Sequence, residues 1–331
     1  MIEVDFLETL NNIRDSVEPE LSQAYEIMQE VVNQAPGNLS KYMNELVSRK
    51  GKRMRACFVL LIAASGRQKS SERAAVVSCS IELLHLATLV HDDIIDQSDM
   101  RRNSKSAHKK WGSQRAVLIG DFALSKALEL IINEEDRRIP SSISRAASHL
   151  IAGEVLEIDQ MGNLNLTVKE YFEVIYGKTA SLWETCGECG AILAGFNDEQ
   201  VRKCATVGKN MGLAFQIIDD LLDFGVGAKD LGKEMNSDLQ NGLITLPMIL
   251  FFKDASQKKQ EEMKKLLNNS SNGKQQQRIK ELLQETDSFV RTKEMALEKI
   301  RNSTLIFSEF PRSEYFVRLM KLGELMVERT A

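Results

Sequence analysis

Apolar residues recur three and four positions apart along most of the chain, which is the spacing that puts them on one face of an α-helix. Clear examples run through 83–90 and 211–222. Alternating runs of β-branched residues, which would indicate strands, are scarce, and most of the five prolines stand near expected element ends. The pattern predicts an all-α protein of ten or more helices.

The breaks between these periodic stretches are short and polar, as turns between packed helices usually are. They fall at 65–71, 133–142, 194–200 and 308–314. None resembles an interdomain linker, so we predict a single domain over 1–331. The stretch 224–238 is longer and rich in glycine, and we expect it to act as a mobile cover.

Composition narrows the functional classes. The 331 residues are 43% hydrophobic and carry a net charge of −4, which supplies a core and gives no basic surface for nucleic acid. We found no apolar run of bilayer-spanning length and expect no membrane insertion. Five cysteines, an odd number, argue against a disulfide framework, and Cys186 and Cys189 are expected to be small core residues rather than zinc ligands. These features favour a cytoplasmic protein.

Two acidic clusters share the pattern DDxxD within apolar helical segments. One alone would be compatible with a solvated acidic face, but two with identical spacing favour metal binding. Positions i, i+1 and i+4 of a helix project in similar directions, so each cluster presents several oxygens together. Mg²⁺ prefers such ligands and commonly joins one or two carboxylates to a substrate diphosphate. The six residues are Asp92, Asp93, Asp96, Asp219, Asp220 and Asp223.

Short basic motifs supply complementary charge. Arginine forks pair well with phosphate, and lysine acts as a compact cation. Together with the acidic clusters they predict two anionic groups, one held through metal and one held directly. The motifs are GKRMR (51–55), MRR (100–102), YGKTA (176–180) and LGK (231–233).

The ordered set of motifs resembles the trans-prenyltransferases, the all-trans isoprenyl diphosphate synthases related to farnesyl diphosphate synthase. The resemblance runs from GKRMR through IELLHLATLVHDDIID (81–96), GKTASL (177–182) and GLAFQIIDDLLDF (212–224) to SDLQNGLITLP (237–247). It implies the isoprenoid synthase type of fold, a large antiparallel helical bundle around a deep central cavity, usually as a homodimer.

The resemblance also implies substrates and roles. The substrates would be isopentenyl diphosphate and an allylic diphosphate, and the six aspartates would surround three Mg²⁺. The allylic diphosphate would contact Arg101, Lys178, Thr179, Gln216 and Lys233. The diphosphate of isopentenyl diphosphate would contact Lys52, Arg53, His85 and Arg102. Ionisation of the allylic C–O bond would leave a carbocation, which the double bond of isopentenyl diphosphate attacks before a proton is lost.

Three positions depart from the family pattern. Asn103 stands where the family usually has Gly, Ala56 where it usually has Pro, and Leu243 where a Lys is common. The last change removes a possible diphosphate contact, for which Lys229 or Lys233 is a candidate replacement.

Small residues before the first cluster predict a long product. In the family, bulky side chains at the positions of Ala87 and Thr88 block the growing chain, and Leu84 is a further candidate for the pocket floor. We therefore expect a medium- or long-chain product suited to a quinone side chain. The alternatives are a short-chain synthase, a subunit of a heteromeric prenyl synthase, and a class I terpene cyclase, which lacks the paired second DDxxD.

Overall fold

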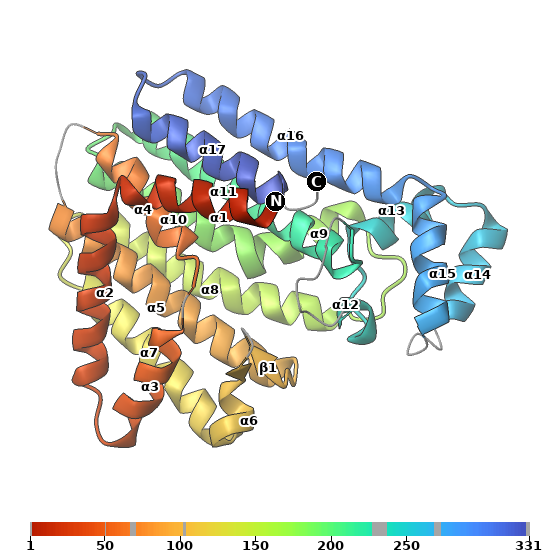
Figure 1. Cartoon of the computed structure of the whole chain (residues 1–331), viewed down its shortest axis with the longest axis horizontal. Helices are drawn as coiled ribbons and strands as arrows, with labels where there is room; N and C mark the ends of the chain where they lie inside the picture. Colours follow the sequence, from red (N-terminus) through yellow and green to blue (C-terminus); the bar gives the residue numbers. More distant parts are fainter. Residues whose placement is uncertain are drawn as a thin grey trace. The chain divides into compact units, whose positions relative to one another are not determined.

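The computed structural model describes residues 2–49, 51–66, 71–101, 104–226, 237–267 and 273–328, with backbone alone for 2–7 and 237. These residues are almost entirely helical, as the periodicity predicted (Figure 1). The first helices are α1 (Ile2–Asp15), α2 (Glu18–Asn33), α3 (Asn38–Ser48), α4 (Met54–Ala64), α5 (Ser71–Ile95), α6 (Ala107–Trp111), α7 (Ser113–Ile131) and α8 (Arg138–Asp159).

The later elements begin with α9 (Val168–Ile175), which leads into a π-helical turn, η1 (Tyr176–Ala180). They continue with α10 (Ser181–Leu193), α11 (Asp198–Asp223), α12 (Ser237–Gln240), α13 (Leu246–Asp254), α14 (Gln257–Leu267), α15 (Gly273–Gln284), α16 (Ser288–Ser308) and α17 (Glu314–Glu328). Two short strands, β1 (Met100–Arg101) and β2 (Ser104–Lys105), pair antiparallel with Arg101 opposite Ser104.

The chain divides into two compact units. Unit 1 contains Met1–Ser148, Leu182–Gly208 and Arg312–Leu319, and unit 2 contains His149–Ser181, Lys209–Pro311 and Met320–Ala331. The division points fall inside helices α8, α11 and α17, at the start of α10, and between α16 and α17. The expectation of one domain over 1–331 stays a prediction.

Helix α5 is the core of unit 1 and packs against α2, α4 and α7 (Figure 1). It is long and apolar enough to cross a membrane by length and composition, contrary to the expectation that no segment was, but 61% of its apolar window is buried inside the protein. A helix that is apolar on most of its circumference is one that other helices surround. The apolar character of α5 is therefore explained by burial in the protein core.

The five cysteines are buried free thiols, which confirms the prediction that Cys186 and Cys189 are core residues. Burial raises the pKa of the Cys57 thiol to about 12, so this side chain stays protonated and unreactive. Cys189 belongs to α10, whose glycines allow close packing. Gly187 lies against the backbone of Cys204, and Gly190 lies against Ile62. The CxxC spacing thus belongs to a tightly packed helix face.

In unit 2, α13 packs against α9, α15 and α16, and α14 pairs with α15. The aromatic rings of Phe224, which directly follows α11, and Phe289, in α16, lie 5.6 Å apart between centroids. The chain that leaves α11 is therefore held by an apolar contact within this unit.

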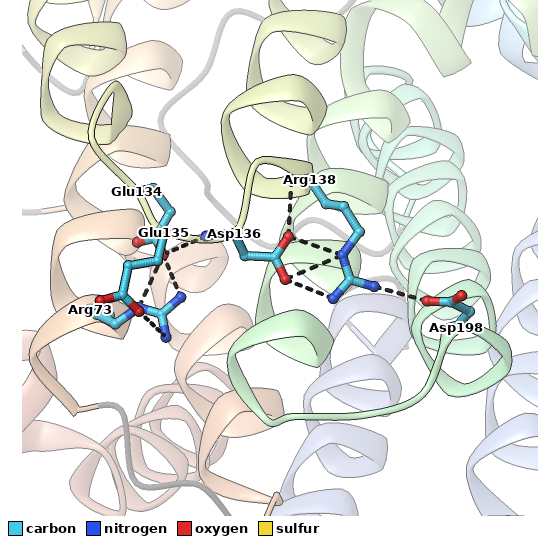
Figure 2. A network of polar contacts seen from close by, with 6 residues as sticks. All are labelled: Arg73, Glu134, Glu135, Asp136, Arg138 and Asp198. Atoms are coloured by element: carbon cyan, nitrogen blue, oxygen red, sulfur yellow. Dashed lines mark hydrogen bonds and ion pairs between the residues drawn. The ribbon is translucent and has the colours of Figure 1, made fainter.

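A polar network in unit 1 joins the start of α5, the turn between α7 and α8, and the start of α11 (Figure 2). Arg138 is its centre: the guanidinium lies 2.7 Å from Asp136 and 2.8 Å from Asp198. Asp136 Oδ1 also accepts the backbone N–H of Arg138 at 3.0 Å, which caps the first turn of α8. On the other side of the turn, Arg73 Nε donates to Glu134 at 3.0 Å.

The Asp136→Asn variant is expected to lower the free energy of unfolding at pH 7 by roughly 1 kcal/mol, as partly exposed pairs and caps usually do. The side-chain hydrogen bond from Arg138 holds the pKa of Asp136 below its usual range. A depressed carboxyl pKa stabilises the fold above the unfolded-state pKa, and this stabilisation is lost as pH falls through the folded-state value. Urea unfolding at pH 7 and at pH 3 should therefore show the difference between variant and wild type shrinking at the lower pH. A difference that grows on acidification would contradict this account.

Candidate functional site

The first acidic cluster lies at the C-terminal end of α5, in unit 1. Asp92 and Asp93 belong to the helix, whereas Asp96 follows its last residue, Ile95. The Asp96 N–H nevertheless donates to the Asp92 carbonyl at 2.8 Å, which continues the helical turn. Asp92 is half-buried and Asp96 is exposed, while Asp93 is buried with 3% of its surface accessible. The DDxxD spacing thus places its first and last carboxylates one turn apart and its middle one in the protein interior.

Arg101 holds the buried member of this cluster. Its Nε donates to Asp93 Oδ1 at 2.7 Å, and a second guanidinium nitrogen lies 2.5 Å from the same oxygen. The predicted diphosphate contact Arg101 is therefore paired with a predicted metal ligand. Arg102 and Asn103 lie outside the described residues.

The GKRMR motif leads into α4 in the same unit. Lys52 is exposed, and the guanidinium of Arg53 lies over the ring of Tyr25, 4.4 Å from its centroid. Arg53 has a positive φ of 47°, which is uncommon for a residue other than glycine. His85 on α5 lies 3.1 Å from Arg55 through Nε2. The structure thus brings His85 to the first turn of α4. A site that His85 shares with the GKRMR segment would require this.

The second acidic cluster occupies the last turns of α11, in unit 2. Asp220 is buried and accepts two hydrogen bonds, one at each carboxylate oxygen. Gln216 Nε2 donates to Oδ1 at 2.9 Å, and the Tyr171 hydroxyl donates to Oδ2 at 2.7 Å. Thr179 Oγ1 in turn donates to Gln216 Oε1 at 2.7 Å. Two predicted diphosphate contacts, Thr179 and Gln216, are thereby joined to a predicted metal ligand.

Burial dominates the electrostatics of this cluster. It raises the pKa of Asp220 to about 7, and the carboxylates of Asp219 and Glu157 add to the rise. Burial also raises the pKa of Asp238, whose backbone N–H donates to Asp223 at 3.2 Å. Concentrated negative charge with little access to water is costly unless a cation is added. The arrangement therefore favours cation binding.

The π-helical turn η1 carries Lys178 and Thr179. Such turns are rare and occur frequently at functional sites. Gly177 and Gly153 of α8 lie so close that a Cβ built on Gly153 would be 2.3 Å from the Lys178 nitrogen. Lys178 Nζ is 3.2 Å from Glu154 and also pairs with Glu157. The predicted diphosphate-binding lysine is thus held by two glutamates of α8.

Four residues of this region were missed by sequence reasoning: Tyr171, Glu154, Glu157 and Asp238. The glutamates are one helical turn apart on α8, a weak signal among many charged pairs in the chain. Asp238 is the second residue of the SDLQNG motif that carried the resemblance, so its motif was noticed although its proximity to Asp223 was not. Tyr171 had no local signal, because its role depends on packing against a distant helix.

The Tyr171→Phe variant is expected to lower the free energy of unfolding by about 1–3 kcal/mol, because it leaves one oxygen of the buried Asp220 carboxylate without its donor. Tyr42→Phe is the control, since the half-buried Tyr42 ring keeps its contact with the Trp111 ring after loss of the hydroxyl. Denaturant unfolding in the presence of a metal chelator measures both. An equal effect of the two substitutions would contradict a special role for the Tyr171 hydroxyl.

The donor atoms suit magnesium. Among the described residues no three His, Cys, Asp or Glu side chains are already arranged around one metal position. Mg²⁺ rarely requires such a cage, because it keeps several waters and takes one or two carboxylates together with substrate phosphate. The hard oxygens of Asp92 and Asp96 in unit 1, and of Asp219 and Asp223 in unit 2, match that requirement. The number of ions, three, stays a prediction.

The predicted length-determining residues lie on α5. Leu84 and Ala87 are each 2% exposed, and Thr88 is half-buried, with its hydroxyl donating to the His85 carbonyl at 2.9 Å. These positions are in the core of unit 1 and within a few turns of Asp92. Lys229 and Lys233, with most of the predicted cover, lie outside the described residues.

Comparison with known proteins gives a consistent family. The sequence profile of the polyprenyl synthetase family matches residues 36–286. The chain is 32% identical to the all-trans-nonaprenyl-diphosphate synthase (geranyl-diphosphate specific) of Rhodobacter capsulatus, over 86% of this chain and 87% of that protein. It is 29% identical to the octaprenyl diphosphate synthase of Escherichia coli (strain K12), over 86% and 88%.

A crystal structure of a polyprenyl synthase from Caulobacter crescentus CB15, complexed with calcium and isoprenyl diphosphate, superposes with a TM-score of 0.89. The two chains are 27% identical, and the match covers 97% of this chain and 98% of that one. The fold prediction of the isoprenoid synthase type is confirmed. The chain belongs to the polyprenyl synthetase family and is a prenyltransferase.

Proposed function

We propose that the protein is an all-trans polyprenyl diphosphate synthase that condenses isopentenyl diphosphate head to tail with an allylic diphosphate, in the presence of Mg²⁺, to a medium or long chain. The observation that best supports this proposal is the hydrogen-bonded series Thr179–Gln216–Asp220. Lys178 lies next to Thr179 on the π-helical turn η1. The series joins two groups that suit a diphosphate to the second acidic cluster, whose Asp219 and Asp223 suit a metal. The octaprenyl and nonaprenyl names of the relatives support the longer product.

The role proposed for each residue follows from the chemistry of its side chain. Bound Mg²⁺ supplies positive charge that stabilises the departing diphosphate. Asp92, Asp96, Asp219 and Asp223 would hold it, while the buried Asp93 and Asp220 orient Arg101 and Gln216 through the hydrogen bonds described above. Arg101, Lys178, Thr179, Gln216 and Lys233 would contact the allylic diphosphate.

Lys178 must exchange partners for this role. In the structure its ammonium group is held by Glu154 and Glu157, with 22% of the side chain exposed. A diphosphate carries a more concentrated negative charge than two carboxylates, so it would compete with the glutamates for the ammonium group. The two glutamates keep the ammonium oriented before substrate binds.

The second substrate would be held by the GKRMR segment, with Lys52, Arg53, His85 and Arg102 as the diphosphate contacts. The apolar residues of α5 next to Asp92, among them Leu89 and Val90, would help to exclude water from the carbocation. No protein nucleophile is required by this mechanism.

We further propose that the enzyme acts in the cytoplasm as a homodimer. The free thiol state of all five cysteines suits a reducing compartment. In unit 1, Leu118 of α7 and Ile132, which directly follows this helix, are 63% and 61% exposed, and in unit 2, Ile151 of α8 is 63% exposed. Exposed apolar faces of this kind mark protein interfaces. Light scattering after gel filtration tests the dimer, and a monomer at assay concentration would contradict it.

One assay tests the proposed reaction. Purified protein is incubated with Mg²⁺, labelled isopentenyl diphosphate and geranyl, farnesyl or geranylgeranyl diphosphate, and products are separated by length after dephosphorylation. Linear products longer than geranylgeranyl support the proposal. Products that stop at the farnesyl or geranylgeranyl length would support the short-chain alternative. Cyclised hydrocarbon would indicate a cyclase, and no elongation by this chain alone would indicate a subunit of a heteromeric enzyme.

A further inference from the structure

Helix α4 begins without a cap of its own. Its N-cap residue is Arg53, which has φ 47° and ψ 39° and makes no side-chain capping hydrogen bond. The first N–H groups of a helix have no partner within the helix, and they are usually satisfied by a side chain at the N-cap. A non-glycine residue in the left-handed region is also strained, and such strain persists only where surrounding contacts hold it. The start of α4 therefore needs support from elsewhere.

Glu82 of α5 provides that support. Its Oε1 accepts the backbone N–H of Ala56, the third residue of α4, at 3.1 Å. This is the position that an N-cap side chain normally satisfies, so Glu82 caps α4 from a neighbouring helix. A carboxylate at this end also lies favourably in the field of the helix dipole. Both helices belong to unit 1, and they pack against each other.

A second contact between the same two helices lies one turn further on. His85 follows Glu82 by three positions on α5 and is therefore on the same face. It contacts Arg55 at 3.1 Å, and the Arg55 guanidinium lies over the ring of Trp183, 5.3 Å from its centroid. Helix α5 thus holds the first turn of α4 at two points, one on the backbone and one on a side chain.

We propose that Glu82 is a positioning residue for isopentenyl diphosphate binding: by capping α4 it fixes the strained start of that helix and hence the placement of Lys52 and Arg53. The inference rests on the proposed function, which assigns the diphosphate of this substrate to the GKRMR segment. Glu82 itself touches no substrate in this scheme. It acts through the Ala56 N–H.

Ala56 makes the proposal specific to this chain. The resembled family usually has Pro at this position, and proline has no N–H to donate. Proline instead fixes φ near the helical value and is tolerated in the first turn of a helix. In this chain the hydrogen bond between the Ala56 N–H and Glu82 therefore fixes the first turn of α4, as the restricted backbone of a proline would fix it in the family. An Ala56→Pro substitution should accordingly make Glu82 dispensable.

The experiment measures the KM of each substrate and the binding of isopentenyl diphosphate alone by calorimetry, in the absence of an allylic substrate. Glu82→Ala is expected to raise the KM and the Kd for isopentenyl diphosphate on the order of tenfold, because displaced contact groups lose much of their effect. The KM for the allylic diphosphate should be unchanged. Glu82→Gln keeps an acceptor oxygen and should stay within about threefold of wild type.

The double variant tests the route of the effect. In an Ala56→Pro background, adding Glu82→Ala should change the KM for isopentenyl diphosphate by less than about threefold, since interacting positions are non-additive. The full tenfold loss in that background would overturn the proposal. So would an equal rise in both KM values, which would indicate a general structural role. Glu72→Ala, which removes an exposed carboxylate from the first turn of the same helix, is the charge control.

Failure of this inference is distinguishable from failure of the proposed function. Lys52→Ala and Arg53→Ala should each raise the KM for isopentenyl diphosphate if the segment binds that substrate. If neither does, the substrate assignment is wrong whatever Glu82 does. If both do and Glu82→Ala does not, the substrate assignment stands and the positioning role is wrong. Thermal unfolding of each variant confirms that the folded protein is being compared.

Discussion

The Asp92→Asn variant is expected to lose turnover by about a thousandfold, the upper range for removing one group that stabilises charge in a transition state. Asn keeps the size of the side chain and one oxygen but removes the negative charge that a hard cation requires. Asp92 is half-buried at the end of α5, so its charge is less screened by water than an exposed one. Steady-state turnover at saturating Mg²⁺ and substrates measures the effect, with Mg²⁺ binding followed by calorimetry in parallel.

Asp99→Asn is the matched control for this prediction. Asp99 lies a few residues further on, is exposed, and pairs with Lys109 at 2.8 Å. The same chemical change there should leave turnover within about twofold of wild type, because exposed ion pairs contribute little. Asp219→Asn should behave like Asp92→Asn if both clusters hold metal. Equal, small effects at Asp92 and Asp99 would show that the first DDxxD is only a solvated acidic face.

The helices and both acidic clusters were predictable because their signals are local. Apolar spacing in the sequence determines which segments are helical, and DDxxD is visible within five letters. The buried positions of Asp93 and Asp220 were not predictable in the same way. Each depends on partners that are distant in sequence or in another element, as Tyr171 is for Asp220. A pattern gives the spacing of carboxylates but not which of them faces water.

The π-helical turn at Tyr176–Ala180 illustrates a different limit. Its sequence, YGKTA, was selected for its lysine, and nothing in helical periodicity distinguishes a π turn from an α turn. The distinguishing feature is the close contact of Gly177 with Gly153, which is a tertiary property. Similarly, the departure at Ala56 was visible in the sequence, but its meaning required the hydrogen bond that the Ala56 N–H donates to Glu82 on another helix.

These cases separate the residues proposed to touch substrate from those that hold them in position. The proposed contact residues are mostly charged and lie in short motifs, so a sequence reveals them. Placing residues are recognised by burial and by hydrogen bonds to the contact residues. Asp220, with both of its oxygens occupied by Gln216 and Tyr171, has the properties of the second kind.

The Ala87→Phe variant is expected to shift the product distribution to chains shorter by several five-carbon units. Ala87 lies on α5 about one helical turn before Asp92, and it is 2% exposed, so a phenyl ring there must occupy space inside unit 1. If the growing chain runs from the diphosphate along α5, that ring stops it after fewer additions, while the chemistry at the acidic cluster is untouched. Products made with farnesyl diphosphate as primer, dephosphorylated and separated by length, measure the shift.

Overpacking must be separated from blocking, because inserting a large side chain into a filled core typically costs about 1–3 kcal/mol of stability. Ala75→Phe provides the comparison: Ala75 is fully buried on the same helix, about three turns nearer its start. It should lower stability to a similar degree and leave product length unchanged. If Ala87→Phe lowers stability without changing product length, chain length is set elsewhere. The same conclusion follows if both variants shorten the product equally. Shortening by Ala87→Phe alone would show that the small side chain of Ala87 leaves the space in which the chain grows.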